Sequence, residues 1–253
     1  MIFSLLTDVS SFDKVSLINH FDDEVKNEEK LNRMIVQLNE GKPYQYVLGY
    51  SEFLGHKFYV NENVLIPRQE TELLVLKTLD LIEKHFKNQE ISILDMCSGS
   101  GIIGITISEK TGLKVDMVDI SKEANETAKK NNDLNKTKCD IYLSDMFNDL
   151  PLKKYDVIIS NPPYIKSEIT VDKATLKYEP HLALFASPQT KFYEEIFKQY
   201  GKYYSSKFIL AFEIDEDMKD DLISLINKYF KDDISYSFEN DIYGKLRYLY
   251  IIG

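Results

Sequence analysis

The stretch Leu94-Asp95-Met96-Cys97-Ser98-Gly99-Ser100-Gly101-Ile102-Ile103-Gly104 decides the fold of this 253-residue chain. It joins the apolar run 91–96, which predicts a buried strand, to the apolar segment 102–111, which predicts a helix. Its glycines permit a sharp turn and a close approach of backbone to ligand. Their spacing matches G-x-G-x-x-G, and Asp119 follows at the end of the next expected strand. We therefore expect a loop that binds a nucleoside-containing cofactor, with Asp119 accepting hydrogen bonds from its ribose hydroxyls. The plainer alternative is a tight turn beside a solvated aspartate.

Asp95 indicates which cofactor this is. A carboxylate just before the glycine loop would repel a pyrophosphate, but it suits the positively charged end of S-adenosylmethionine. The expected cofactor-binding loop is completed by Cys97, Ser98, Gly99, Ser100 and Gly101. After the third expected strand, Asp145 could bind the adenine amino group and Met146 could cover the adenine face, although Met146 and Phe147 could equally be core residues. S-adenosylhomocysteine would be the product.

Strands and helices alternate from residue 91 to the carboxyl end. The expected strands are 91–96, 114–119, 139–143, 155–160, 208–214, 234–238 and 246–251, and the expected helices are 102–111, 122–134, 191–204 and 218–230. A short, turn-rich link, 239–244, predicts that the last two strands are antiparallel. This pattern predicts an α/β fold, a doubly wound sheet with an antiparallel hairpin at its edge.

The first 90 residues contain different patterns. Residues 1–45 look helical, with Asn27 as a helix start before an apolar face that recurs at helical spacing. Two β-rich runs, 43–49 and 53–60, suggest a hairpin that links this part to the main domain. A further strand is expected at 64–66, ended by Pro67, and Thr71 is a candidate cap for the helix that follows.

The sequence Ser160-Asn161-Pro162-Pro163-Tyr164 follows the apolar strand 155–160. Because neither proline has an N–H, this turn cannot extend a ladder, and it leaves the Asn161 amide at the carboxyl end of the strand. Ligands of open α/β sheets bind at that edge. A purely structural turn is the alternative.

The composition restricts the classes of partner. A formal net charge of −10 and a sequence pI near 5.0 favour a protein or small-molecule substrate over duplex nucleic acid. No apolar run approaches the ~20 residues that cross a bilayer. The amino terminus lacks a basic flank and a long apolar region, so we do not expect it to be a signal peptide. Cys97 and Cys139 lack metal-binding or redox spacing, so we expect free thiols in the cytoplasm and no metal site.

With these parts in place, the chain resembles the HemK/PrmC family of peptide chain release factor glutamine methyltransferases. The resemblance runs from about residue 40 to the carboxyl end, through Pro43-Tyr44-Gln45-Tyr46, Leu65-Ile66-Pro67-Arg68, Asn161-Pro162-Pro163-Tyr164-Ile165, Tyr178-Glu179-Pro180 and the terminal hairpin with Arg247. It implies a class I S-adenosylmethionine-dependent methyltransferase with a Rossmann-like sheet. The implied domains are a helical domain for substrate docking at 1–42, a β-hairpin linker at 43–66 and a catalytic domain at 67–253. Two departures are Cys97-Ser98, where the family often has Gly-Thr, and a helical part shorter than usual.

The resemblance implies methyl transfer to the amide nitrogen of the glutamine in a Gly-Gly-Gln motif, which supports translation termination. Asn161 and the Pro162 carbonyl would accept the two amide hydrogens, and Tyr164 would cover the amide face, so Asn161, Pro162 and Tyr164 are the expected catalytic residues. Pro163 would complete the substrate site, and Asn161 would also contact the cofactor. The implied partner is a release factor, with no direct nucleic-acid contact, no membrane association and a monomeric state.

Other functions remain open at this point. An adenine amino-methyltransferase acting on DNA or RNA would use the same acceptor geometry on a flipped base. A nicotinamide-dependent dehydrogenase would give Asp95 and the proline turn no role, and a non-catalytic binding module would leave Asn161 unexplained. Arg68 is expected to orient its loop by a salt bridge or to meet substrate, and Glu179 to order the loop after the proline turn.

Overall fold

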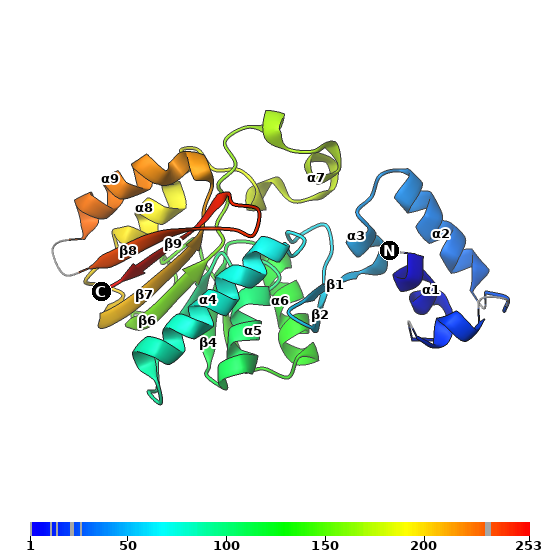
Figure 1. Cartoon of the computed structure of the whole chain (residues 1–253), viewed down its shortest axis with the longest axis horizontal. Helices are drawn as coiled ribbons and strands as arrows, with labels where there is room; N and C mark the ends of the chain where they lie inside the picture. Colours follow the sequence, from blue (N-terminus) through cyan, green and yellow to red (C-terminus); the bar gives the residue numbers. More distant parts are fainter. Residues whose placement is uncertain (1, 11, 14, 21–22, 26, 231–233) are drawn as a thin grey trace.

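A seven-stranded sheet between two layers of helices forms the body of the protein, and a small group of amino-terminal helices lies beside this body (Figure 1). The structure is a computed structural model that describes residues 2–10, 12–13, 15–20, 23–25, 27–230 and 234–253. No helix within these residues is long and apolar enough to cross a membrane.

The sheet has the strand order β5-β4-β3-β6-β7-β9-β8. Its strands are β3 (Ile93–Met96), β4 (Val115–Asp119), β5 (Cys139–Leu143), β6 (Tyr155–Ser160), β7 (Tyr204–Glu213), β8 (Ser235–Asn240) and β9 (Leu246–Ile252). All neighbours pair in parallel except β9, which is antiparallel to both β7 and β8. The strand order reverses between β3 and β6, and a crevice at the carboxyl ends of the strands is expected at this point.

Helices cover both faces of the sheet (Figure 1). On one face lie α4 (Gln69–Phe86), α5 (Ile102–Thr111) and α6 (Lys122–Leu134), and on the other lie α8 (Lys191–Phe197) and α9 (Lys219–Tyr229), preceded by η4 (Glu216–Met218). Each layer has its own apolar core: Leu74, Ile105 and Met117 belong to the first, and Tyr193, Phe197 and Phe212 to the second. The doubly wound α/β fold and its antiparallel hairpin are therefore confirmed.

The amino-terminal helices form a separate small core. They are α1 (Ile2–Ser10), η1 (Ser16–His20) and α2 (Glu28–Asn39), and Leu5, Val9 and Met34 are buried between them. Asn27 is the N-cap of α2, as expected, because its side chain accepts a hydrogen bond from the Lys30 N–H. The chain then enters α3 (Tyr44–Leu48) and the hairpin of β1 (Tyr50–Phe53) and β2 (His56–Tyr59).

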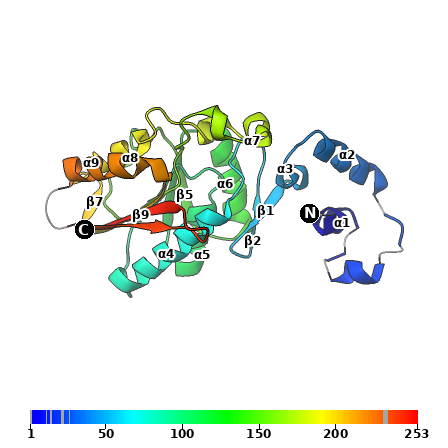
Figure 2. The ribbon, with the colours of Figure 1, turned by 45° about the horizontal axis from the view of Figure 1, so that its top comes forward.

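The segment between β6 and α8 crosses the edge of the sheet where the parallel strands end. It contains η2 (Glu168–Thr170), α7 (Lys173–Tyr178) and η3 (His181–Ala183). In both Figure 1 and Figure 2, α7 lies between the sheet and the amino-terminal helices. Consistent with this position, the Tyr178 hydroxyl and the Lys177 ammonium both donate to the Glu40 carbonyl at the end of α2.

Two expected β-rich segments are wrong. Residues 44–48 form a short helix instead of a strand, because Pro43 precedes it and Gly49 ends it with a left-handed φ of 78°. The hairpin is real but is confined to β1 and β2. Residues 64–66 form no strand, since their backbone is bound by side chains: the Val64 carbonyl accepts from the Tyr46 hydroxyl, and the Ile66 N–H donates to Glu179.

Two expected helix boundaries are also wrong. The helix expected at 191–204 ends at Phe197, since the chain turns through Gly201 at a φ of 84° and Tyr204 begins β7. Thr71 is not a cap, because α4 begins at Gln69 after Arg68 as N-cap. The hydroxyl of Thr71 instead donates to Glu213, a residue of β7.

Candidate active site

A cavity opens at the carboxyl ends of β3, β4 and β6, at the point where the strand order reverses. We call it the site cavity. Its lining comes from the glycine loop, the ends of β4 and β6, the segment before α4, and the loops around α7 and α8: Asn63, Val64, Leu65, Ile66, Pro67, Arg68, Thr71, Met96, Cys97, Ser98, Gly99, Ser100, Ile102, Ile103, Val118, Asp119, Ile120, Ser121, Ala124, Ser144, Asp145, Met146, Asn161, Pro163, Pro180, Leu182, Ala183, Lys191 and Phe192.

The glycine loop lies tightly against the ends of two strands. The Ser98 N–H donates to the Val118 carbonyl, and the Gly99 N–H donates to Asp119 Oδ2 at 2.8 Å. Gly101 adopts a left-handed φ of 81°. A Cβ at Gly104 would lie 2.7 Å from Met117 Cγ, so only glycine lets α5 pack this close to β4. The loop therefore keeps its backbone at the cavity wall.

Cys97 also has a left-handed conformation, with a φ of 62°. Such angles are uncommon for a residue with a side chain and free of cost for glycine. A glycine at this position would adopt the same angle without that cost. The Cys97 thiol lies 4.0 Å from Met146 Sδ, and burial raises its pKa, so the thiol stays protonated and acts as a small apolar group.

Asp119 is the last residue of β4, and both of its carboxylate oxygens accept hydrogen bonds from backbone N–H groups. Oδ2 accepts from Gly99 and Oδ1 accepts from the Ser121 N–H at 2.8 Å. Burial raises the pKa of the carboxyl, and these backbone hydrogen bonds oppose the rise. Each oxygen keeps a second lone pair, so Asp119 can still accept hydrogen bonds from a vicinal diol.

The cavity residues fit a nucleoside cofactor of the expected kind. The hydroxyls of Ser98 and Ser100 are buried in the cavity wall and have no hydrogen-bond partner among the described residues, which leaves two polar groups available to a ligand. Asp145 and Met146 line the cavity next to Asp119, and the Ser144 hydroxyl holds their turn by donating to the Met146 carbonyl. The cavity thus offers carboxylates, hydroxyls and apolar surface, the kinds of group that a nucleoside-containing cofactor such as S-adenosylmethionine can contact.

Asp95 and Gly101 lie outside the cavity lining. The Asp95 side chain is fully buried beneath the loop, where Oδ2 accepts from the Gly104 N–H at 2.9 Å and Oδ1 has no partner in the part of the chain that the structure describes. Burial raises the pKa of this carboxyl to about 8. Any effect of Asp95 on a cofactor must therefore act through the loop or through space.

The 161–164 turn reaches the cavity through Asn161 and Pro163, whereas Pro162 and Tyr164 are outside the lining. Asn161 Nδ2 donates to Thr71 Oγ1 at 3.1 Å, and that hydroxyl donates to Glu213 Oε2 at 2.7 Å. The Tyr164 hydroxyl donates to the other oxygen of Glu213 at 2.9 Å.

Glu213 and Thr71 are site residues that the sequence reasoning missed. Glu213 stands at the carboxyl end of β7, next to β6, and is 2% exposed. A signal for Glu213 was present: it follows the apolar run Phe208-Ile209-Leu210-Ala211-Phe212, so its carboxylate had to lie at the edge where Asn161 ends its own strand. Thr71 gave no such signal, because it resembles any threonine in a first helical turn.

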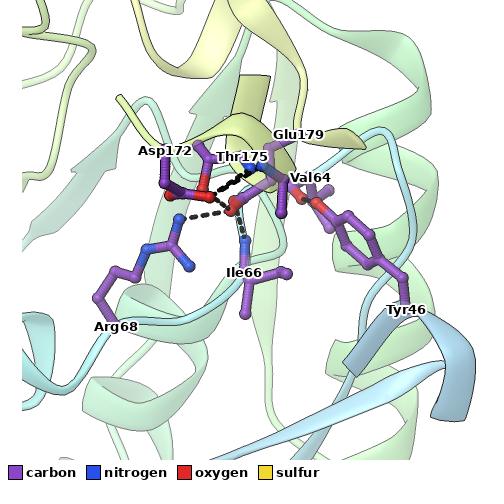
Figure 3. Close-up of polar contacts among 8 residues, drawn as sticks. Tyr46, Val64, Ile66, Arg68, Asp172, Thr175 and Glu179 are labelled. Atoms are coloured by element: carbon purple, nitrogen blue, oxygen red, sulfur yellow. Dashed lines mark hydrogen bonds and ion pairs between the residues drawn. The ribbon is translucent and has the colours of Figure 1, made fainter. Parts of the chain in front are cut away.

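Besides the group formed by Glu213 and its partners, Glu179 and Arg68 form a polar cluster beside the cavity (Figure 3). Glu179 is 4% exposed; its Oε1 lies 2.5 Å from the Arg68 guanidinium and also accepts from the Thr175 hydroxyl, while Oε2 accepts from the Ile66 N–H. Both expectations are met in geometry: Arg68 makes a salt bridge, and Glu179 ties down the loop after the 161–164 turn. The described residues contain no group of three or more His, Cys, Asp or Glu side chains that could hold a metal ion.

Comparison with known sequences links these features to methyltransferases. The family described as "Methyltransferase small domain" matches residues 73–178. A release factor glutamine methyltransferase of Flavobacterium psychrophilum is 37% identical over 221 residues, which cover 85% of this chain and 76% of that protein. Its counterpart in Bacillus cereus is 33% identical and covers 89% of this chain and 83% of its own length. The protein of that name in Leptospira interrogans is 34% identical, and the match covers 97% of this chain and 87% of that protein.

Solved structures support the fold. A methyltransferase from Pyrococcus furiosus superposes with a TM-score of 0.57 at 17% identity, covering 79% of this chain and 89% of that one. A plantazolicin methyltransferase solved in complex with SAH gives a TM-score of 0.51 at 18% identity, covering 72% of this chain and 84% of that one. At such identities the likeness concerns the fold alone.

Proposed function

This chain belongs to the release factor glutamine methyltransferase family, and on that premise we propose how its residues carry out the reaction. It is an S-adenosylmethionine-dependent protein-glutamine N-methyltransferase. The substrate we propose is the glutamine of a Gly-Gly-Gln motif in a release factor, so that the enzyme acts in the cytoplasm on translation termination. The identity of 33–37% with proteins of this name, over 85–97% of the chain, supports this assignment.

S-adenosylmethionine, when bound, supplies a methyl group on a positively charged sulfur, an electrophile that needs no enzymic nucleophile. In our proposal Ser98, Gly99, Ser100 and Asp119 hold this cofactor, with Asp119 on the ribose. Asp145 would bind the adenine amino group. The unpartnered hydroxyls of Ser98 and Ser100 and the spare lone pairs of Asp119 support these roles.

The chain's remaining task is to orient the substrate amide. An amide nitrogen is a poor nucleophile because its lone pair is delocalised into the carbonyl. Acceptors placed on both N–H groups fix the amide plane and stabilise the positive charge that grows on nitrogen. The methylated nitrogen then loses its extra proton, which leaves a neutral N-methyl amide and S-adenosylhomocysteine as products. We assign these acceptors to Asn161 Oδ1 and the Pro162 carbonyl, with Pro163 and Tyr164 completing the substrate site.

The position of Asn161 carries this proposal. It lines the cavity at the end of β6, and its Nδ2 is already used by Thr71. No described residue donates a hydrogen bond to Asn161 Oδ1, so this oxygen is available to a substrate N–H.

The domains would divide the work. We propose that residues 1–42 dock the release factor, that 43–66 link the two parts and that 67–253 perform catalysis as a monomer. The contacts of Tyr178 and Lys177 with the Glu40 carbonyl support communication between the docking helices and the loop over the cavity.

The test is incubation of the purified enzyme with labelled S-adenosylmethionine and either a release factor or DNA. We expect label in the release factor alone. Asn161→Ala should lower turnover on the order of 100-fold or more with cofactor affinity nearly unchanged, whereas Asp119→Ala should weaken cofactor binding. Label in DNA, or a wild-type rate from Asn161→Ala, would refute the proposal.

A further inference from the structure

We propose that Glu213 and Thr71 are positioning residues that determine which end of the Asn161 carboxamide faces the substrate. This inference rests on the proposed function, because it assumes that Asn161 Oδ1 accepts a hydrogen bond from the glutamine amide. It goes beyond that function by identifying how the chain keeps an oxygen, and not an NH₂ group, at that position.

Glu213 is the fixed point of the arrangement. It ends β7 beside β6, it is 2% exposed, and its two carboxylate oxygens accept from two different hydroxyls. Thr71 Oγ1 donates to Oε2 at 2.7 Å, and the Tyr164 hydroxyl donates to Oε1 at 2.9 Å. An ionised carboxylate can only accept hydrogen bonds, so both hydroxyl protons must point toward it.

The carboxylate thereby decides the direction of the next hydrogen bond. A threonine hydroxyl has one proton, and that of Thr71 is committed to Glu213. Its oxygen can then only accept from Asn161, 3.1 Å away, so Asn161 must turn its NH₂ group toward Thr71. The two ends of a carboxamide have almost the same shape, and hydrogen bonding alone selects between them.

The selected orientation is the one that catalysis requires. With Nδ2 held by Thr71, Oδ1 is the end left for the cavity, where it can accept an amide hydrogen. With the carboxamide reversed, an NH₂ group would oppose the N–H groups of the substrate, and the site would repel its glutamine. Tyr164, four residues after Ser160 in the same turn, is bound to the same carboxylate, so both ends of the 161–164 turn are held from Glu213.

Two substitutions of Thr71 separate positioning from packing. Thr71→Val keeps the volume and removes the hydroxyl, whereas Thr71→Ser keeps the hydroxyl. Thr78→Val is the matched control, since Thr78 is also a buried threonine of α4 but donates to the Leu74 carbonyl, away from the site. Each variant is assayed for turnover, for KM of the release factor and for Kd of S-adenosylmethionine.

We expect Thr71→Val to lower kcat roughly tenfold or more, since an unsatisfied or reversed amide costs about one hydrogen bond. Its Kd for S-adenosylmethionine should stay within about twofold of wild type, because Thr71 is not among the residues that we propose to hold the cofactor. Thr71→Ser and Thr78→Val should stay close to wild type. Glu213→Gln should lower kcat in the same way, because its amide must donate to one of the two hydroxyls, and adding Thr71→Val to it should cost little more.

The inference is overturned if Thr71→Val turns over at the wild-type rate, or if Thr71→Ser loses as much activity as Thr71→Val. A failure of Glu213→Gln to fold leaves the Thr71 pair as the deciding comparison. Asn161→Ala distinguishes this failure from that of the proposed function. An inactive Asn161→Ala with an unaffected Thr71→Val removes only the positioning role, whereas a fully active Asn161→Ala removes both.

Discussion

Glu179 binds Arg68 across 111 positions of sequence, with 2.5 Å between Oε1 and the guanidinium nitrogen (Figure 3). Its second oxygen accepts from the Ile66 N–H at 3.0 Å. One carboxylate thus joins the loop after the 161–164 turn to the segment before α4. Both segments line the cavity, through Ile66 and Arg68 on one side and Pro180 and Leu182 on the other.

Glu179→Ala should therefore open the cavity wall. We expect a loss of about 1–3 kcal/mol in the free energy of unfolding, mainly because the buried Ile66 N–H loses its acceptor. The lost ion pair contributes less, because Arg68 is about a third exposed and solvent screens its charge. The Kd for S-adenosylmethionine should also rise, because the loosened segments line the cavity. Denaturant titration and calorimetry measure the two effects. Glu83→Ala, which breaks an exposed pair with Lys87, should change neither; equal effects of both variants would contradict the assigned role of Glu179.

Glu213 should make turnover sensitive to acid. Burial raises the pKa of its carboxyl, while hydrogen bonds from Thr71 and Tyr164 oppose the rise. As pH falls through this raised pKa, Glu213 gains a proton, can donate to Thr71, and releases the Asn161 orientation, so kcat should fall on the acid side.

The pH profile of kcat at saturating substrates measures this effect. We expect Glu213→Gln to be slow at every pH and to lose the fall in kcat at acid pH. If the Glu213→Gln profile keeps the acid fall of the wild type, that fall belongs to the titration of another group. The titratable or hydrogen-bonding side chains that face Glu213 are Glu70, Thr71, Tyr164, Tyr193, Arg247, Tyr248 and Tyr250.

Asp95 should make the free energy of unfolding depend on pH. Burial raises the pKa of its carboxyl to about 8 in the folded protein, whereas an unfolded aspartate titrates near 3.8. Between these values the folded state holds a proton that the unfolded state has lost, so stability falls as pH rises, by at most about 1.4 kcal/mol per pH unit. Asp95→Asn should flatten this slope between about pH 5 and 8, and urea titrations at several pH values measure it. An unchanged slope would show that Asp95 is ionised in the folded protein.

Gly104→Ala should disturb the loop through α5. The added Cβ would lie 2.7 Å from Met117 Cγ and Sδ and 3.1 Å from Asp95 Oδ2, so the helix or the Met117 side chain must shift. We expect a destabilisation of about 1–3 kcal/mol from overpacking and weaker binding of S-adenosylmethionine. Gly112→Ala is the control, because its φ of 71° adds backbone strain in open space and far from the cavity. It should lower stability but leave the Kd unchanged; a similar change in Kd for both would refute a local effect.

Several elements could be predicted from local sequence to the residue. The helices at Ile102–Thr111 and Lys122–Leu134 and the strands at Cys139–Leu143 and Tyr155–Ser160 begin and end as expected. Each has its own boundary signal, such as the left-handed Gly101 and Gly112 around α5 or the Ser121 side chain that caps α6. Asn161, Asp119 and the glycine loop lie together because parallel strands end at a common edge.

The sequence by itself determined the individual strands of the sheet, the glycine loop and the turn that presents Asn161, since each of these depends on residues close together in the chain. Only the tertiary structure decided that 64–66 is not a strand, because its N–H at Ile66 is bound by Glu179, 113 positions away. It also decided that Thr71 is no cap but a link between Asn161 and Glu213. Local patterns record which groups need a hydrogen bond, and only the packed chain determines which distant group supplies it.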